Sequence, residues 1–336
     1  FASPHPGLVT DRVRFVGDYV AFIVAESVAE AKDAAELVLV DYEPINSVTD
    51  TAQAPSGKAP AVWDECPDNI SNVFAQGDED ATNAAFAKAD HIIKKRFVIN
   101  RITASPMEVR GVVGNYDHRQ GRYEVYNDIQ APHALRQNLA ENIFKVPETD
   151  VRVVTGDVGG AFGMKGPVYP EIRLWAWASK RIGRPVKWHC ERSESFQSDE
   201  ACRDNVSEAE LALSSDGTFL GLRVKTIASL GAYLSHDRGL IPTFLNVGVL
   251  AGVYTTPAIH SIVTAVFSNT NPTSPYRGAG RPEAAYVLES MIDIAAMELG
   301  MDRIELRRKN TIPPEAMPFK TGLTYTYDCG EFEKNM

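Results

Sequence analysis

Segments that resemble β-strands outnumber helical segments in this chain, and the two kinds do not alternate regularly. Apolar or alternating runs typical of strands occupy 91–100, 111–117, 121–128, 206–213, 218–235 and 259–270. Helical patterns are fewer, at 82–90, 132–144 and 170–183, with a long one from Pro282 that ends at Gly300 and a short one after it. A regular alternation would indicate a doubly wound parallel sheet, so the observed order predicts an α+β fold.

The chain divides into three regions by sequence pattern. Residues 1–48 predict a compact strand–helix–strand unit, with a turn at Gly17-Asp18 and a helix that Ser27 and Glu30 begin as a capping box. Residues 49–75 are rich in proline and small residues and predict a linker. Residues 76–336 form the main body. A length of 336 residues is compatible with two domains.

Charge and cysteine content exclude several kinds of partner and site. The net charge of −10 argues against nucleic acid as a partner, and no apolar run is long enough to span a membrane. The four cysteines show no CxxC spacing, so we expect neither a zinc site nor an iron–sulfur site in this chain. The cysteine usage favours a reducing cytoplasmic location.

The densest glycine run, Thr155–Pro167 with the sequence TGDVGGAFGMKGP, lies between a predicted strand and a predicted helix. It lacks the G-x-x-x-x-G-K-[ST] spacing of a Walker loop, because Gly166 follows Lys165. It also lacks the G-x-G-x-x-G spacing of a dinucleotide-binding loop. Two interpretations stay open on these grounds: a simple turn, or a loop whose backbone N–H groups approach a ligand.

Two further motifs accompany the glycine run, NDIQAPHALR around Gln130 and SPYRGAGRPEAAYVLE around Arg277. The three motifs together resemble the large, molybdopterin-binding subunit of the molybdenum hydroxylases, a family that includes xanthine dehydrogenase, aldehyde oxidoreductase and carbon monoxide dehydrogenase. The resemblance covers nearly the whole chain. It implies a partial α/β hammerhead domain at 1–48, followed by the first half of the molybdopterin-binding domain at 76–336.

The resemblance implies which residues contact the cofactor: Gln130, Gly160, Ala161, Phe162, Gly163, Arg277, Gly278 and Ala279. Gln130 matches a glutamine that hydrogen-bonds an oxo ligand of molybdenum, where an amide donates without adding charge. Arg277 would offer a permanent positive charge to an anionic cofactor. Glu108 is expected to be structural, and Lys165 is assigned no chemistry.

The resemblance also implies cofactors and partners. We expect molybdopterin, in its cytosine dinucleotide form, with molybdenum held by the pterin dithiolene rather than by protein side chains. The [2Fe–2S] clusters and FAD are expected on partner chains, an iron–sulfur subunit and an FAD subunit. The family's catalytic glutamate lies in a second molybdenum domain or its subunit, so no catalytic residue is expected here, and this chain is interpreted as an interior piece of a longer subunit.

Differences from the family motifs narrow the expected substrate. Gly278 stands where carbon monoxide dehydrogenases carry a copper-binding cysteine, and Gly166 and Ala279 stand where purine oxidases carry an acid and an aromatic ring. The missing acid and aromatic ring argue against a stacked purine, and the missing cysteine leaves copper without a ligand. The resemblance then implies hydroxylation of an aldehyde, N-heterocycle or related electron-poor carbon of a small organic molecule, with water as the oxygen source. The alternative is a pterin-binding or scaffold fragment without catalytic activity.

Overall fold

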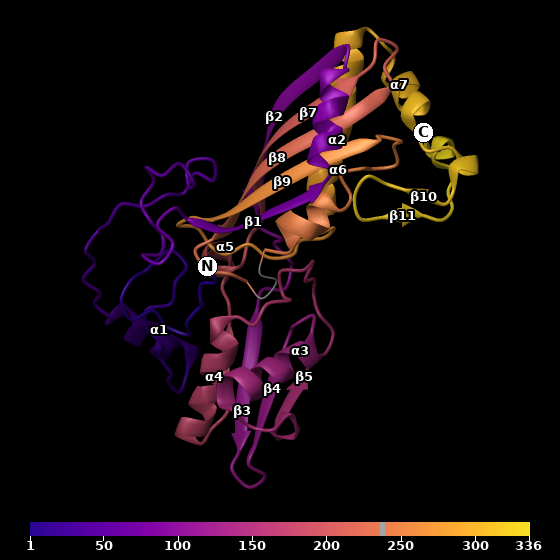
Figure 1. Ribbon diagram of the computed structural model, residues 1–336. Helices are drawn as coiled ribbons and strands as arrows, with labels where there is room; N and C mark the ends of the chain where they lie inside the picture. The colour runs from indigo at the N-terminus through magenta and orange to yellow at the C-terminus, as the bar shows by residue number, and fades with distance from the viewer. Residues whose placement is uncertain (236–238) are drawn as a thin grey trace.

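The computed structural model describes residues 1–235 and 239–336. The chain forms two lobes, each built on its own sheet, and the N-terminal segment runs along one side of both (Figure 1). The predicted α+β class is confirmed, because the strands of both sheets are mostly antiparallel and the helices pack on their faces.

The upper lobe holds a five-stranded sheet in the order β1-β9-β8-β7-β2. The strands are β1 (Ile70–Gly77), β2 (His91–Ile102), β7 (Cys202–Leu213), β8 (Phe219–Gly231) and β9 (Ala258–Phe267). Only β8 and β9 pair in parallel. Strands β7 and β8 form an antiparallel hairpin, which places their alternating residues opposite one another.

Two helices cover opposite faces of the five-stranded sheet (Figure 1). Helix α6 (Arg281–Leu299) packs its apolar side against one face, and α2 (Glu79–Ala87) crosses the other. The largest core lies between α6 and the sheet, where burying such side chains removes apolar surface from water. Its fully buried members include Leu211, Leu213, Leu222, Ile259, Met291, Ile292 and Ala295.

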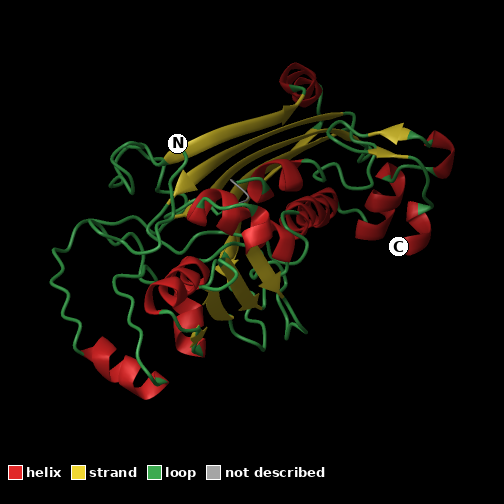
Figure 2. Ribbon diagram, turned by 90° about the horizontal axis from the view of Figure 1, so that it is seen from below, coloured by secondary structure: helices red, strands yellow, loops and turns green. Residues whose placement is uncertain are grey.

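The lower lobe holds a four-stranded sheet in the order β5-β4-β3-β6. Its strands are β3 (Gly111–Asp117), β4 (Arg122–Asn127), β5 (Val151–Val154) and β6 (Val186–His189). Helices α3 (Pro132–Gln137) and α4 (Pro170–Ile182) pack on it, and a π-helical segment, Asn138–Phe144, continues α3. Figure 2 shows this sheet and its helices beneath the larger sheet.

The remaining elements connect the lobes or follow them along the chain. They are α1 (Val28–Glu36), α5 (Arg192–Ser198), α7 (Arg303–Asn310), β10 (Phe319–Lys320), β11 (Thr326–Tyr327), the π-helix Ile241–Leu245, and 3₁₀ turns at Glu148–Asp150, Pro314–Ala316 and Phe332–Asn335. No helix in the described ranges is long and apolar enough to cross a bilayer.

The expectation of two strands around the helix in residues 1–48 is wrong for this structure. Helix α1 is present and begins at Ser27, whose hydroxyl accepts a hydrogen bond from Glu30 N–H. Its flanking segments form no strand within the described residues, and Val16 and Leu39 are largely exposed. A strand needs a ladder of hydrogen bonds to a neighbour. The N–H of Val9 bonds to the carbonyl oxygen of Tyr19, but no described strand pairs with these apolar runs.

The predicted linker, 49–75, is partly integrated into the upper lobe. Its last residues enter β1, which begins at Ile70. Trp63 is buried, and its indole N–H donates to the carbonyl oxygen of Ala232 at 2.7 Å. This region therefore contributes to a small core beside the sheet, while the domain boundaries 1–48, 49–75 and 76–336 stay a prediction.

His5 ties the N-terminal segment to the upper lobe and makes stability depend on pH. Its ring stacks on Tyr233 at a centroid distance of 4.3 Å. Burial, with the nearby charges of Arg173 and Arg110, lowers the pKa of His5 from 6.5 to about 3. The unfolded chain therefore binds a proton below pH 6.5 that the folded chain refuses until about pH 3, so stability is lost as pH falls through this window.

We expect the thermal midpoint of the wild-type chain to decrease as the pH is lowered from 6.5 to 4. His5→Phe should make this decrease smaller, because the phenyl ring keeps the stacking on Tyr233 without a titrating group. The exposed His91, changed to Phe, is the control and should leave the pH dependence as in wild type. Equal pH slopes for His5→Phe and wild type would show that His5 does not carry the effect.

Candidate functional site

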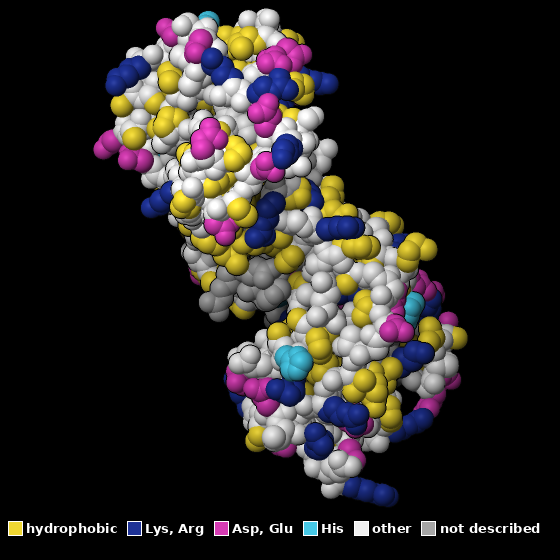
Figure 3. Space-filling view, turned by 90° about the vertical axis from the view of Figure 1, so that its right-hand side faces the viewer, with side chains coloured by type: hydrophobic (Ala, Val, Ile, Leu, Met, Phe, Trp, Pro, Cys, Tyr) yellow, Lys and Arg dark blue, Asp and Glu magenta, His cyan; other side chains and the backbone are white. Residues whose placement is uncertain are grey.

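The candidate site lies between the two lobes, where four chain segments meet. Figure 3 shows that the surface of the molecule is hollowed where the two lobes join. Because β4 and β5 are parallel, their carboxyl ends share one edge of the lower sheet. Gln130 follows β4, and the glycine run follows β5. The segment before β3, with Glu108, reaches the same edge because β3 is antiparallel to β4. The turn before α6, with Arg277, contacts the glycine run.

The side-chain amide of Gln130 is oriented by the glycine run. Its Oε1 accepts a hydrogen bond from the backbone N–H of Gly163 at 2.7 Å. Since a backbone N–H can only donate, this contact assigns Oε1 and leaves Nε2 as the outward atom. Among the described residues Nε2 has no partner, and the side chain is exposed. Gln130 therefore presents two uncharged N–H donors at the edge of the sheet.

The backbone of Gly160–Gly163 takes conformations that favour glycine. Gly160 has φ +98° and Gly163 has φ +106°, and a Cβ on Gly163 would lie 2.3 Å from the carbonyl oxygen of Pro275. Ala161 accepts a hydrogen bond from Met164 N–H, which closes a tight turn. Phe162 lies inside this turn with φ +53°, and its side chain is 42% exposed. Phe162 is thus a surface residue of the site and no part of the core.

Arg277 contacts the glycine run through its backbone. Its N–H donates to the carbonyl oxygen of Phe162 at 2.8 Å, which joins the turn before α6 to the run. Gly278 (φ +96°) and Ala279 (φ +39°) complete a tight turn after it. The guanidinium group of Arg277 is exposed and has no partner in the described part of the chain. The turn that contacts the glycine run therefore carries a permanent positive charge on an exposed side chain.

The structure thus brings together the three motifs that the sequence singles out. Hydrogen bonds connect Gln130 to Gly163 and Phe162 to Arg277. Gly160 lies against the Phe162 ring, because a Cβ there would approach it to 3.2 Å. Which of these residues contact a cofactor stays a prediction.

Sequence reasoning missed an ionic group that is centred on the buried Lys165 of the glycine run. Lys165 is buried, and its Nζ lies 2.9 Å from Oε2 of Glu108 and 2.5 Å from Oδ2 of Asp128. The same Oε2 accepts the N–H of Gly159 at 2.7 Å. The hydrogen bond from Lys165 holds the pKa of Glu108 below its ordinary value. A lone lysine among glycines was the available signal, but nothing in the sequence identifies its partners.

A second ionic contact supports the turn that carries Arg277. Arg203, at the start of β7, pairs with the buried carboxylate of Glu283 at 2.6 Å, and its guanidinium lies 5.1 Å from the ring centre of Tyr276. Arg203 has φ +67°, which is strained for a residue with a side chain. The pair therefore fixes the start of α6 against the upper sheet.

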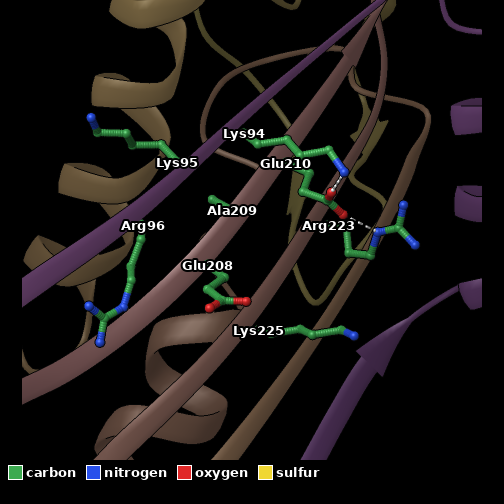
Figure 4. A pocket seen from close by; sticks show the side chains of 8 residues that line it. All are labelled: Lys94, Lys95, Arg96, Glu208, Ala209, Glu210, Arg223 and Lys225. Atoms are coloured by element: carbon green, nitrogen blue, oxygen red, sulfur yellow. Dashed lines mark ion pairs between the residues drawn. The ribbon is translucent and has the colours of Figure 1, made fainter. Parts of the chain in front are cut away.

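A hollow over the outer face of the upper sheet is separate from this site (Figure 4). It is lined by charged side chains of β2, β7 and β8. Glu210 lies between Lys94 and Arg223, with ion pairs of 2.6 and 2.8 Å. This cross-strand pairing compensates part of the local charge, because Lys and Arg side chains outnumber the carboxylates in the lining. No residue of the three motifs contributes to the hollow.

Protein side chains do not provide a metal centre in the described ranges. No group of three or more His, Cys, Asp or Glu side chains is placed there to hold a metal ion.

Two family descriptions match the chain in the predicted order. The a/b hammerhead domain of aldehyde oxidase and xanthine dehydrogenase matches residues 2–46. The molybdopterin cofactor-binding domain matches residues 62–311. The chain belongs to the molybdopterin cofactor-binding domain family. The predicted resemblance and fold class are therefore confirmed, and the hammerhead match covers the region where the structure forms only α1.

Relatives of this molybdopterin cofactor-binding domain are large chains of multi-subunit enzymes. The 6-hydroxypseudooxynicotine dehydrogenase complex subunit gamma of Paenarthrobacter nicotinovorans is 34% identical over 98% of this chain and 42% of its own length. The carbon monoxide dehydrogenase large chain of Hydrogenophaga pseudoflava is 33% identical over 97% of this chain and 42% of its own.

The structure of quinoline 2-oxidoreductase from Pseudomonas putida 86 superimposes with a TM-score of 0.92 at 34% identity. That match covers 98% of this chain and 42% of the solved chain. The molybdopterin cofactor-binding domain described here thus spans about two fifths of the length of these relatives.

Proposed function

We propose that this chain is part of the catalytic subunit of a molybdenum-dependent oxidoreductase and that it forms one wall of the cofactor site. The observation that carries the proposal is the continuous contact from Gln130 through Gly163 and Phe162 to Arg277. These contacts join residues from three distant motifs at one exposed edge, and the family match supports molybdopterin as the ligand.

The chemistry of the site fits an anionic pterin cofactor that carries molybdenum. Nε2 of Gln130 offers donors without charge, and the guanidinium of Arg277 offers a compensating positive charge. Gly163 lacks a Cβ where the chain packs against Pro275, and Gly160 lacks one where it packs against Phe162 and Pro106, so both hold the loop in one conformation. The exposed ring of Phe162 limits the space beside them. When bound, the cofactor supplies the redox chemistry, while the chain binds and orients it.

We propose the cytosine dinucleotide form of the pterin, and [2Fe–2S] clusters and FAD on an iron–sulfur and an FAD subunit. The names of the relatives support separate subunits, since one is a complex subunit gamma and another a large chain. We further propose that the catalytic base lies in a second molybdenum domain or its subunit. The four unpaired cysteines fit a reducing cytoplasm.

We propose hydroxylation, with oxygen from water, of an aldehyde, an N-heterocycle or a related electron-poor carbon. The relatives named for quinoline and for 6-hydroxypseudooxynicotine support a nitrogen-containing substrate. The deciding experiment is elemental and pterin analysis of the parent enzyme purified with its partner subunits. Molybdenum and pterin near one per large subunit are expected, and their absence would overturn the proposal.

Arg277→Ala tests the role of the positive charge. A hydrogen bond to a charged group contributes about 1.5–3 kcal/mol, so we expect roughly a tenfold to hundredfold loss in cofactor retention or turnover. Molybdenum content and rate are measured in the purified complex. Arg152→Ala, at an exposed position of β5, is the control and should leave both unchanged. Unchanged molybdenum content and rate in Arg277→Ala would contradict the assignment.

A further inference from the structure

Lys165 occupies an unusual position for a lysine, because its side chain is only 1% exposed. Its ammonium group lies between two carboxylates from different segments, Glu108 before β3 and Asp128 after β4. A buried ammonium group has a large desolvation cost that such pairing offsets. The three charges form an ionic group directly beneath the glycine run.

Two of these three residues, Glu108 and Lys165, are also hydrogen-bonded to the backbone of the proposed cofactor wall. Oε2 of Glu108 accepts the N–H of Gly159 at 2.7 Å, at the start of the segment Gly159–Gly163. The carbonyl oxygen of Lys165 accepts the N–H of Gln130 at 3.0 Å, just after the end of this segment. Lys165 therefore links both ends of the wall to β4 through its side chain and its backbone.

We propose that Lys165 is a positioning residue that fixes Gln130 and Gly159–Gly163 relative to each other, so that their donors meet the cofactor in one geometry. This inference rests on the proposed function. A contribution to folding stability does not explain well why a buried lysine is paired here, because a buried ion pair can often be replaced by apolar or neutral residues without loss of stability. Orientation is the better reason, because residues that hold ligand-binding groups in place commonly change affinity when altered.

A role of Lys165 in stability and a role in positioning predict different results for two variants of the parent enzyme complex. Lys165→Met leaves Glu108 and Asp128 facing each other without a cation, so it should lower both stability and molybdenum content. A triple variant that adds Glu108→Gln and Asp128→Asn removes the leftover charges. Under the positioning role it regains the thermal midpoint, while molybdenum content stays roughly tenfold to a hundredfold lower.

Three measurements are made on each complex: the thermal midpoint, the molybdenum content with its electron paramagnetic resonance spectrum, and amide hydrogen exchange of Gly159–Gly163. Lys94→Met is the matched control, because Lys94 is also ion-paired but lies exposed on β2. We expect faster exchange and an altered spectrum in both Lys165 variants and neither change in the control. A triple variant with wild-type molybdenum content, spectrum and exchange would overturn the inference.

The two proposals fail in distinguishable ways. A wild-type complex without molybdenum overturns the proposed function, whatever the variants do. In that case faster exchange confined to Gly159–Gly163 in the Lys165 variants still supports a positioning role for Lys165 on the loop. A wild-type complex with molybdenum, together with a Lys165→Met variant identical to it in all three measurements, overturns the positioning role alone.

Discussion

Replacing Gly163 by valine is expected to destabilise the chain and to remove most of the cofactor from the parent enzyme. The residue has φ +106°, and a Cβ would lie 2.3 Å from the carbonyl oxygen of Pro275. Forcing a side chain into this conformation costs about 1–3 kcal/mol, and overpacking adds about as much. Relief of the clash has to move the Gly163 N–H away from Gln130 or move the turn that carries Arg277.

The thermal midpoint and molybdenum content of the complex check this expectation, with Gly156→Val as the matched control. Gly156 lies in the same run, its φ is outside the left-handed range, and a Cβ there would meet no heavy atom within 4 Å. We expect Gly156→Val to behave nearly as wild type. Similar losses in both variants would mean that the run tolerates no side chain anywhere and that the contact with Pro275 is not the cause.

Arg110→Met is expected to produce the second large effect, a loss of about 3–5 kcal/mol in stability, because removing one partner of a buried ion pair leaves uncompensated charge. Arg110 is buried just before β3 and pairs with Glu171 in the first turn of α4 and with Asp199 just after α5. Its guanidinium also lies 3.9 Å from the ring centre of Tyr169. Methionine keeps much of the volume and leaves the buried carboxylates of Glu171 and Asp199 without this cation.

A shift in the urea denaturation midpoint measures the loss, and Arg184→Met provides the comparison. Arg184 pairs with Glu26, and both side chains are more than half exposed. Exposed pairs contribute about 0–1 kcal/mol, so the control should shift little. If both variants shift the midpoint equally, burial does not determine the effect. If Arg110→Met shifts it no further than the control, the network around Arg110 is not a main source of stability.

The sequence predicts well those elements that form locally. The pattern from Gly111 to Asp117 has the bounds of β3, and Gly183 ends α4 as a left-handed residue after the predicted helix. Hydrophobic period and turn residues are properties of short stretches, so they can be read without knowing what packs against them. The same method fails around α1, because a strand also requires a neighbour that local pattern does not supply.

The candidate site also has one part that the sequence predicts and one part that only the assembled fold shows. Gln130, the glycine run and Arg277 are recognised because their motifs resemble a family, and the structure then places them in contact. The partners of Lys165 are not predictable from pattern. Glu108 lies 57 residues before Lys165, and neither carboxylate has a local feature that announces its pairing. Pairing of this kind is decided by which strand ends share an edge, which is known only from the assembled sheet.

The backbone hydrogen bond between Arg277 and Phe162 also has a consequence for how the candidate site depends on the two lobes. It joins the turn before α6, which packs on the upper sheet, to the glycine run, which follows β5 of the lower sheet. Each sheet has its own core. The spacing between the motifs of the proposed cofactor wall is therefore set by how the two sheets are placed against each other, and by neither sheet alone.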